Sequence, residues 1–145
     1  MLEDKASRPN RHAVETLWTN NPKEVAEIAA RRIKLAPTPE TLVYLNYRAR
    51  PVVPRSGAYS AVGSAFVYSD VSWDDGKDDA VNRKWSDEFI TSLAGFDNAA
   101  YINETEFVRH PERAAHCYSA ESWKRLKQVI DRYDPQGLFV AAGSA

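Results

Sequence analysis

The most regular alternation in the chain is the segment Ala65-Phe66-Val67-Tyr68-Ser69-Asp70-Val71-Ser72-Trp73. Successive side chains of a β-strand point to opposite faces of its sheet. One face of this segment therefore carries Phe66, Tyr68 and Asp70, and the other carries Val67, Ser69 and Val71. The pattern predicts a strand from Ala65 to Trp73.

The sequence after this strand predicts a helix, a short strand and a second helix. Residues 74–79 form a polar turn, and the first helix ends at Gly95. Its apolar side chains recur every four residues: Val81, Trp85, Phe89 and Leu93. A short strand is predicted from Ala99 to Glu104. The last helix begins after Ser119 and ends before Pro135, with the stripe Trp123, Leu126, Ile130 and Tyr133.

The sequence before the strand predicts a lead-in followed by two helices. Residues 1–11 are polar and charged, which is typical of a flexible segment, and a helix is predicted from His12 to Thr19. Asn21 is the predicted N-cap of the second helix, with Pro22 at its first position and Glu24 placed to complete a capping box. The predicted buried stripe of that helix is Val25, Ile28, Ala29 and Ile33.

The middle of the chain supplies a second strand. Thr41 to Arg48 is rich in β-forming residues, and the prolines and glycine of Pro51 to Gly57 predict a loop. The order of elements predicts an α+β fold, an antiparallel sheet backed by helices. At 145 residues the chain has enough material for one domain, or for part of a larger one.

Composition excludes several partners. The 19 Lys and Arg nearly cancel the 20 Asp and Glu, so the chain has no basic field for a nucleic acid. Its apolar runs are far shorter than the roughly 20 residues that cross a bilayer, so no membrane partner is expected. Met1 to Lys5 lacks the pattern of a secretory signal, and the compartment stays open. The single cysteine, Cys117, has no partner for an internal disulfide.

No motif predicts a metal or phosphate site. The acidic run from Asp70 to Asp79 lacks the ligand spacing of a calcium loop, and His110, His116 and Cys117 lack the paired spacing of a zinc site. The six glycines are scattered singly, so they form no phosphate-binding loop.

Tyr101 and Asn103 are the candidate chemical pair. Alternate positions on the predicted strand place the phenol and the amide on one face, about 6.6 Å apart along the strand. A tyrosine can act as a base when nearby cations or donors lower its pKa from about 10, and an amide beside it can orient a ring system. Composition alone favours an ordinary structural tyrosine, because tyrosine is common in strands.

The order of motifs in the second half of the chain favours a functional role for Tyr101 and Asn103. The motifs are Phe66 to Asp75, a helix with Trp85, Ala100-Tyr101-Ile102-Asn103-Glu104, Tyr118 with Leu126, and Arg132 to Phe139. Together they resemble the carboxy-terminal end of berberine-bridge-enzyme-like, FAD-linked oxidoreductases. Chains of that family close with a strand ending in Trp-x-Asp, a Tyr-x-Asn strand, and a helix that leads into Tyr-Asp-Pro.

This resemblance implies a function for the chain. Residues 12–145 would be the substrate-side segment of a flavoprotein oxidase, part of its substrate domain. FAD would be held mainly by a partner chain or by a missing FAD-binding domain, and the substrate would be a small molecule. By the same resemblance Tyr101 is the catalytic base, Asn103 lies on the flavin side, and the substrate-facing residues are Phe66, Tyr68 and Asp70.

Three interpretations stay open at this stage. The chain can be one half of a split, heteromeric oxidase. It can be a non-catalytic small-molecule-binding or dimerisation module derived from that family, a reading that the four tryptophans support because they suffice for an apolar pocket or contact. It can also be a fragment of a longer chain.

Overall fold

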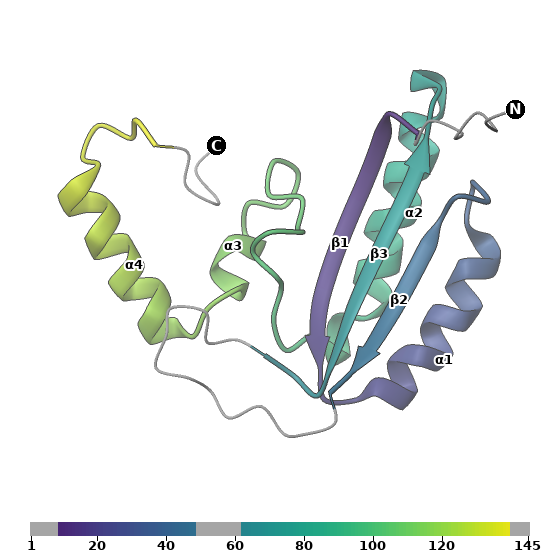
Figure 1. Ribbon diagram of the computed structural model, residues 1–145, viewed down its shortest axis with the longest axis horizontal. Helices are drawn as coiled ribbons and strands as arrows, with labels where there is room; N and C mark the ends of the chain where they lie inside the picture. Colours follow the sequence, from purple (N-terminus) through teal and green to yellow (C-terminus); the bar gives the residue numbers. More distant parts are fainter. Residues whose placement is uncertain (1–8, 49–61, 140–145) are drawn as a thin grey trace, which may run out of the picture.

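Three antiparallel strands form one sheet in the computed structural model, which describes residues 9–48 and 62–139. Strand β3 (Ala65–Trp73) lies in the centre, between β1 (Arg11–Thr19) and β2 (Leu42–Tyr47). Because both outer strands run antiparallel to β3, they are parallel to each other, and helix α1 (Pro22–Arg32) connects them. The predicted α+β fold is confirmed (Figure 1).

Helices cover one face of this sheet. Figure 1 shows α2 (Asp79–Ser92) behind β1 and β3, and α1 beside β2. The side chains that alternate inward from the strands meet the apolar sides of these helices in one core, built around Leu17, Val67, Val71, Val25, Trp85, Phe89 and Leu93. Burial of each such side chain contributes about 1.5–3 kcal/mol. The alternation predicted for β3 is confirmed, since Val67, Ser69 and Val71 are buried here.

The helix predicted from His12 to Thr19 is wrong, because this segment is strand β1. Its residues pair along their whole length with β3, with Ala13 opposite Val71 and Leu17 opposite Val67. Strand β1 begins at Arg11, whereas the predicted lead-in included residue 11. The Arg11 guanidinium is anchored to the Asp79 carboxylate, with Nε 2.5 Å from Oδ1. Residues 1–8 of the lead-in and the predicted loop 51–57 lie outside the described residues.

Helix α1 begins where the sequence predicts, but without the predicted capping box. Pro22 is its first residue and Asn21 its N-cap, yet the Asn21 side chain makes no capping hydrogen bond. Instead, the Asn21 backbone N–H donates to the Thr19 hydroxyl at 3.0 Å. The stripe is confirmed in part: Val25 and Ala29 are buried, whereas Ile28 and Ile33 are partly buried against the core.

The predicted strand from Ala99 to Glu104 is also wrong. Only Ala99 forms a β-bridge, to Trp18 at the end of β1, and the residues that follow form a turn. The Trp18 amide donates to the Ala99 carbonyl at 2.6 Å, and the Tyr101 amide donates to the Thr16 hydroxyl at 2.9 Å. The backbone of Trp18 holds the start of this segment, and the Thr16 side chain holds Tyr101 where the prediction placed further backbone pairing.

Helices α2 and α4 depart from their predicted stripes, and the short helix α3 (Arg113–His116) lies between them in the chain. In α2, Val81 is 50% exposed and Asn82 is buried in its place. Helix α4 (Ala120–Tyr133) is capped as predicted, with the Ser119 hydroxyl accepting from the Ser122 amide. However, α4 has no buried residue among those described: Trp123, Leu126 and Ile130 are half-buried, and Tyr133 is 70% exposed. Among the described residues, no helix is long and apolar enough to cross a membrane.

Gly63 packs directly against the end of β1. A Cβ atom built on it would lie 2.5 Å from the Thr19 carbonyl oxygen, and backbone atoms there have little room to move. We therefore expect Gly63→Ala to lower the free energy of unfolding by about 2 kcal/mol, as measured by urea denaturation. Gly95→Ala is the matched control, because nothing lies within 4 Å of the position that its Cβ atom would take. Equal stability of the two variants would contradict the close packing at Gly63.

Candidate functional site

The second face of the sheet carries the candidate site. Side chains that alternate away from the helices lie here, and the strand register places them in pairs: Trp18 opposite Phe66, His12 opposite Ser72, and Tyr44 opposite Tyr68. In Figure 1 this open face lies in front of α2. The predicted substrate-facing residues Phe66, Tyr68 and Asp70 all belong to it, each partly exposed.

Aromatic rings line one end of the open face. The Trp18 and Phe66 ring centroids are 4.8 Å apart, and the Tyr101 ring meets Phe66 edge-on at 5.7 Å. The Arg48 guanidinium lies over the Trp18 ring, 4.4 Å from its centroid. Such contacts fix the orientation of the rings, which gives this end of the face a rigid apolar wall.

Tyr101 and Asn103 lie together, although no strand places them there. The Asn103 amide Nδ2 donates to the Tyr101 phenol oxygen at 2.9 Å. The turn is fixed by Thr105, whose hydroxyl lies 2.9 Å from the Tyr101 carbonyl and 2.8 Å from the Thr16 hydroxyl. The predicted proximity of phenol and amide therefore holds, with a hydroxyl-anchored turn in place of strand alternation.

A polar cluster occupies the other end of the open face. The Asp70 carboxylate lies at its centre, with Oδ1 2.9 Å from Ser72 Oγ and 3.2 Å from His12 Nδ1. The Tyr68 hydroxyl donates to Asp70 Oδ2 at 3.4 Å. Burial, and then the Asp70 charge, raise the pKa of Tyr68 to about 12. Tyr68 is therefore a hydrogen-bond donor at neutral pH and no base.

Two hollows open on this face and share His12 and Tyr68. The larger, of about 440 Å³, is lined by Pro9, His12, Glu40, Leu42, Tyr44, Tyr68, Asp70 and Ser72. The other, of about 320 Å³, is lined by His12, Val14, Tyr68, Asn103, Glu104, Thr105 and Glu106. Both volumes are near the lower end of the range of small-molecule sites. Tyr68, Asp70 and Asn103 line these hollows, whereas Phe66 and Tyr101 do not.

Sequence reasoning missed three members of this site: His12, Tyr44 and Ser72. His12 was assigned to a helix, and Tyr44 belongs to the site only through the register of β2 with β3. Ser72 continues the alternation of Phe66, Tyr68 and Asp70 on β3 and could have been added from that pattern. The signal for His12 was present, because His12, Val14, Thr16 and Trp18 alternate with Ala13, Glu15 and Leu17 as a strand requires.

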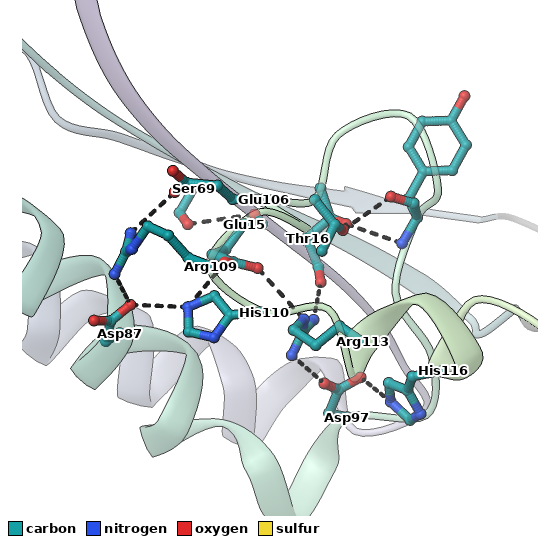
Figure 2. A network of polar contacts seen from close by, with 12 residues as sticks. Glu15, Thr16, Ser69, Asp87, Asp97, Glu106, Arg109, His110, Arg113 and His116 are labelled. Atoms are coloured by element: carbon teal, nitrogen blue, oxygen red, sulfur yellow. Dashed lines mark hydrogen bonds and ion pairs between the residues drawn. The ribbon is translucent and has the colours of Figure 1, made fainter. Parts of the chain in front are cut away.

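A buried ion network holds the turn region against the back of β1. Figure 2 shows Glu15 of β1 beside Arg113 and His110, which in turn contact Asp97 and Asp87. Both Glu15 carboxylate oxygens are buried, and burial raises the pKa of Glu15 to about 7 against the opposing charge of Arg113. The network fixes residues 104–116, and with them the turn that carries Tyr101.

The residues considered as zinc ligands have structural partners. His110 Nε2 lies 3.0 Å from Asp87 Oδ1, and His116 Nε2 lies 2.9 Å from Asp97 Oδ1. Cys117 is buried, and burial raises the pKa of its thiol to about 11. Within residues 9–48 and 62–139, no group of three or more such side chains is placed to hold a metal ion.

The described residues do not fit a whole FAD. A pyrophosphate needs free backbone N–H groups and positive potential, as at a helix N-terminus. Helix α1 begins with Pro22, which has no N–H, and α2 begins among the carboxylates of Asp75, Asp78 and Asp79. The open face offers aromatic and amide groups to a ring system, whereas the N-termini of α1 and α2 are poorly suited to a pyrophosphate.

The fold is shared with a solved structure. No family model matches the chain, and no curated protein sequence does. The chain superposes on the crystal structure of CrmK, a flavoenzyme involved in the shunt product recycling mechanism in caerulomycin biosynthesis, with a TM-score of 0.71 and 21% sequence identity. The match covers 91% of this chain and 31% of CrmK. The chain thus has a fold found in a flavoenzyme, and spans less than a third of that enzyme.

Proposed function

We propose that this chain is the substrate-side portion of a flavin-dependent oxidoreductase of the berberine-bridge-enzyme type, with FAD bound mainly by a partner chain or another domain. The observation that carries the proposal is the fold shared with a flavoenzyme over 91% of this chain. The N-termini of α1 and α2 agree with it, because Pro22 and the carboxylates of Asp75, Asp78 and Asp79 make them poor partners for phosphates. The ordered motifs from Phe66 to Phe139 support the finer assignment to this family.

Each candidate residue has a role in this proposal. Tyr101 removes a proton from a hydroxyl or activated C–H group of the substrate. Asn103 directs the phenol by donating to its oxygen, and lies on the flavin side. Phe66, Tyr68 and Asp70 contact the substrate, with an apolar ring at one end and a hydrogen-bonding carboxylate at the other. The flavin, when bound, supplies a hydride acceptor.

Helix α4 supports the existence of a partner chain or domain. Figure 1 shows it apart from the sheet and its covering helices. Its half-buried stripe of Trp123, Leu126 and Ile130 continues into Leu138 and Phe139, which are 76% and 74% exposed. Adjoining apolar side chains exposed in this way are typical of an interaction surface.

The alternative is a non-catalytic small-molecule-binding or dimerisation module. The two hollows favour it, because described residues of this chain line them in the absence of a flavin. Native mass spectrometry with a visible spectrum, on protein purified from its source, separates the two. A yellow complex with a heavier flavin-bearing chain, or a yellow chain much heavier than 16.3 kDa, supports the oxidase. A colourless homo-oligomer of 16.3 kDa chains removes the enzyme proposal.

A charge on the apolar stripe of α4 tests the proposed contact. We expect Leu126→Glu to weaken binding of the flavin-bearing partner at least about tenfold, because a carboxylate would be desolvated there. The measurement is a titration of the two purified chains. Gln128→Glu adds the same charge at an exposed position of the same helix and should leave the affinity unchanged. Equal affinities of both variants would show that this stripe is not the contact.

A further inference from the structure

His12 contacts its aspartate through a different ring nitrogen from the one that His110 and His116 use. His110 and His116 each direct Nε2 at an aspartate oxygen, at 3.0 and 2.9 Å. His12 instead uses Nδ1, which lies 3.2 Å from Asp70 Oδ1 and 3.0 Å from Ser72 Oγ. Among the described residues, Nε2 of His12 has no hydrogen-bond partner. The His12 side chain is 40% exposed and lines both hollows.

The neighbours of His12 determine where its proton lies. An ionised Asp70 only accepts hydrogen bonds, and the Ser72 hydroxyl donates to the same carboxylate at 2.9 Å. A lone pair on Nδ1 would face the carboxylate at 3.2 Å and be repelled. The neutral ring therefore carries its proton on Nδ1, which leaves a lone pair on Nε2.

His12 also connects the two hollows of the open face. It lines the larger one with Tyr44 and Asp70, and the smaller one with Asn103. Among the described lining residues, the other ionisable groups are Glu40, Tyr68, Glu104 and Glu106, of which Glu106 is paired with Arg83 and Arg109. The carboxylates outnumber the one imidazole, so the site repels anionic ligands and accepts neutral or cationic ones.

We propose that His12 Nε2 is a second proton acceptor of this site, and that Asp70 is its positioning residue. It receives a hydrogen bond, or the proton itself, from an O–H or N–H group of a neutral or cationic substrate. When the proton transfers, the O–H bond breaks, its electron pair stays on oxygen, and an N–H bond forms on Nε2. The imidazolium then lies beside the Asp70 carboxylate, which stabilises it.

The role in oxidation rests on the proposed function, but the His12–Asp70 arrangement and its ligand preference do not. They are therefore tested on the chain alone, without flavin. Long-range ¹H–¹⁵N NMR distinguishes a protonated ring nitrogen from an unprotonated one. We expect the neutral form of His12 to be protonated on Nδ1, and those of His110 and His116 on Nε2, because these are the atoms that donate to aspartate.

Two variants identify the group that sets this tautomer. In Asp70→Val the Ser72 hydroxyl loses its carboxylate and donates to Nδ1, so the proton moves to Nε2. In Ser72→Ala the Asp70 carboxylate remains, so the proton stays on Nδ1. A wild-type His12 protonated on Nε2, or an unchanged tautomer in Asp70→Val, would overturn the assignment. Dispersed amide spectra of both variants show that the chain still folds.

Benzyl alcohol and benzoate test the ligand preference as a matched pair. They share an aromatic ring, but the first donates an O–H and the second is an anion. We expect benzyl alcohol to shift the His12 Nε2 resonance without moving those of His110 and His116, and benzoate to leave all three unmoved. No shift with benzyl alcohol up to its solubility, or an equal shift with benzoate, would overturn the proposed site.

Discussion

Arg113→Met is expected to lower the free energy of unfolding by about 3 kcal/mol at pH 8, and by clearly less at pH 5. The Arg113 side chain lies between two carboxylates, with Nε 3.4 Å from Glu15 Oε2 and a terminal nitrogen 3.2 Å from Asp97 Oδ2. Its other terminal nitrogen donates to the Thr16 carbonyl at 2.6 Å (Figure 2). Without it, the buried Glu15 carboxylate loses its principal counter-charge.

The direction of the pH dependence follows from the pKa of Glu15. Burial raises this pKa from 4.5 to about 7, whereas the charges of Arg113, His110 and Arg109 lower it and Glu106 raises it. A carboxyl whose folded pKa is raised contributes stability that is complete below about pH 4.5 and is lost as the pH rises through about 7. The wild-type chain should therefore become less stable between about pH 5 and 8. Removing Arg113 makes this loss of stability larger, because ionised Glu15 then lacks its principal counter-charge.

Urea denaturation at both pH values measures the effect, and two further variants control it. Glu15→Gln should flatten the pH dependence of the wild type and remove most of the effect of Arg113→Met at pH 8. Arg83→Met breaks a more exposed pair with Glu106, so it should change the stability by less than about 1 kcal/mol. An Arg113→Met effect that is equal at pH 5 and pH 8 would show that Glu15 is not its source.

Glu15 also explains why β1 was not found in the sequence. The strand alternates inward through Ala13, Glu15 and Leu17, but its central inward residue is charged. A carboxylate in a core is tolerated only with buried partners, and these come from Arg113 and His110, in the other half of the chain. Local sequence patterns predicted β2 and β3, whose inward positions carry no charge. They did not predict β1, because the burial of its Glu15 depends on distant residues.

The site was predictable to the extent that it lies on one strand. The alternation of β3 placed Phe66, Tyr68 and Asp70 on one face, and the structure confirms that shared face. His12 joins them only because β1 pairs with β3 so that His12 is opposite Ser72. Tyr101 and Asn103 depend on hydroxyl contacts from Thr16 and Thr105, a long-range anchor that no local period reveals.

Tyr101→Phe is expected to lower the turnover number of the complete oxidase by about 10²–10⁴-fold, the usual contribution of a positioned acid or base. The substitution removes only the hydroxyl, so the edge-on contact of the ring with Phe66 at 5.7 Å should persist. The substrate contacts of Tyr68 and Asp70 are also left intact, so KM should change little. Tyr68 cannot substitute as the base, since burial and Asp70 raise its pKa to about 12.

The measurement is stopped-flow bleaching of the flavin by substrate, in the chain assembled with its flavin-bearing partner or domain. Bleaching reports substrate oxidation separately from reoxidation of the flavin. Tyr118→Phe is the matched control, because its ring stacks on Trp123 at 5.6 Å, outside both hollows. It should bleach at the wild-type rate. If Tyr101→Phe also bleaches at that rate, the proton goes elsewhere, and a large rate loss in His12→Gln would then assign it to the His12–Asp70 pair. If both variants retain full activity, neither group is the base, and the open face serves only to bind the substrate.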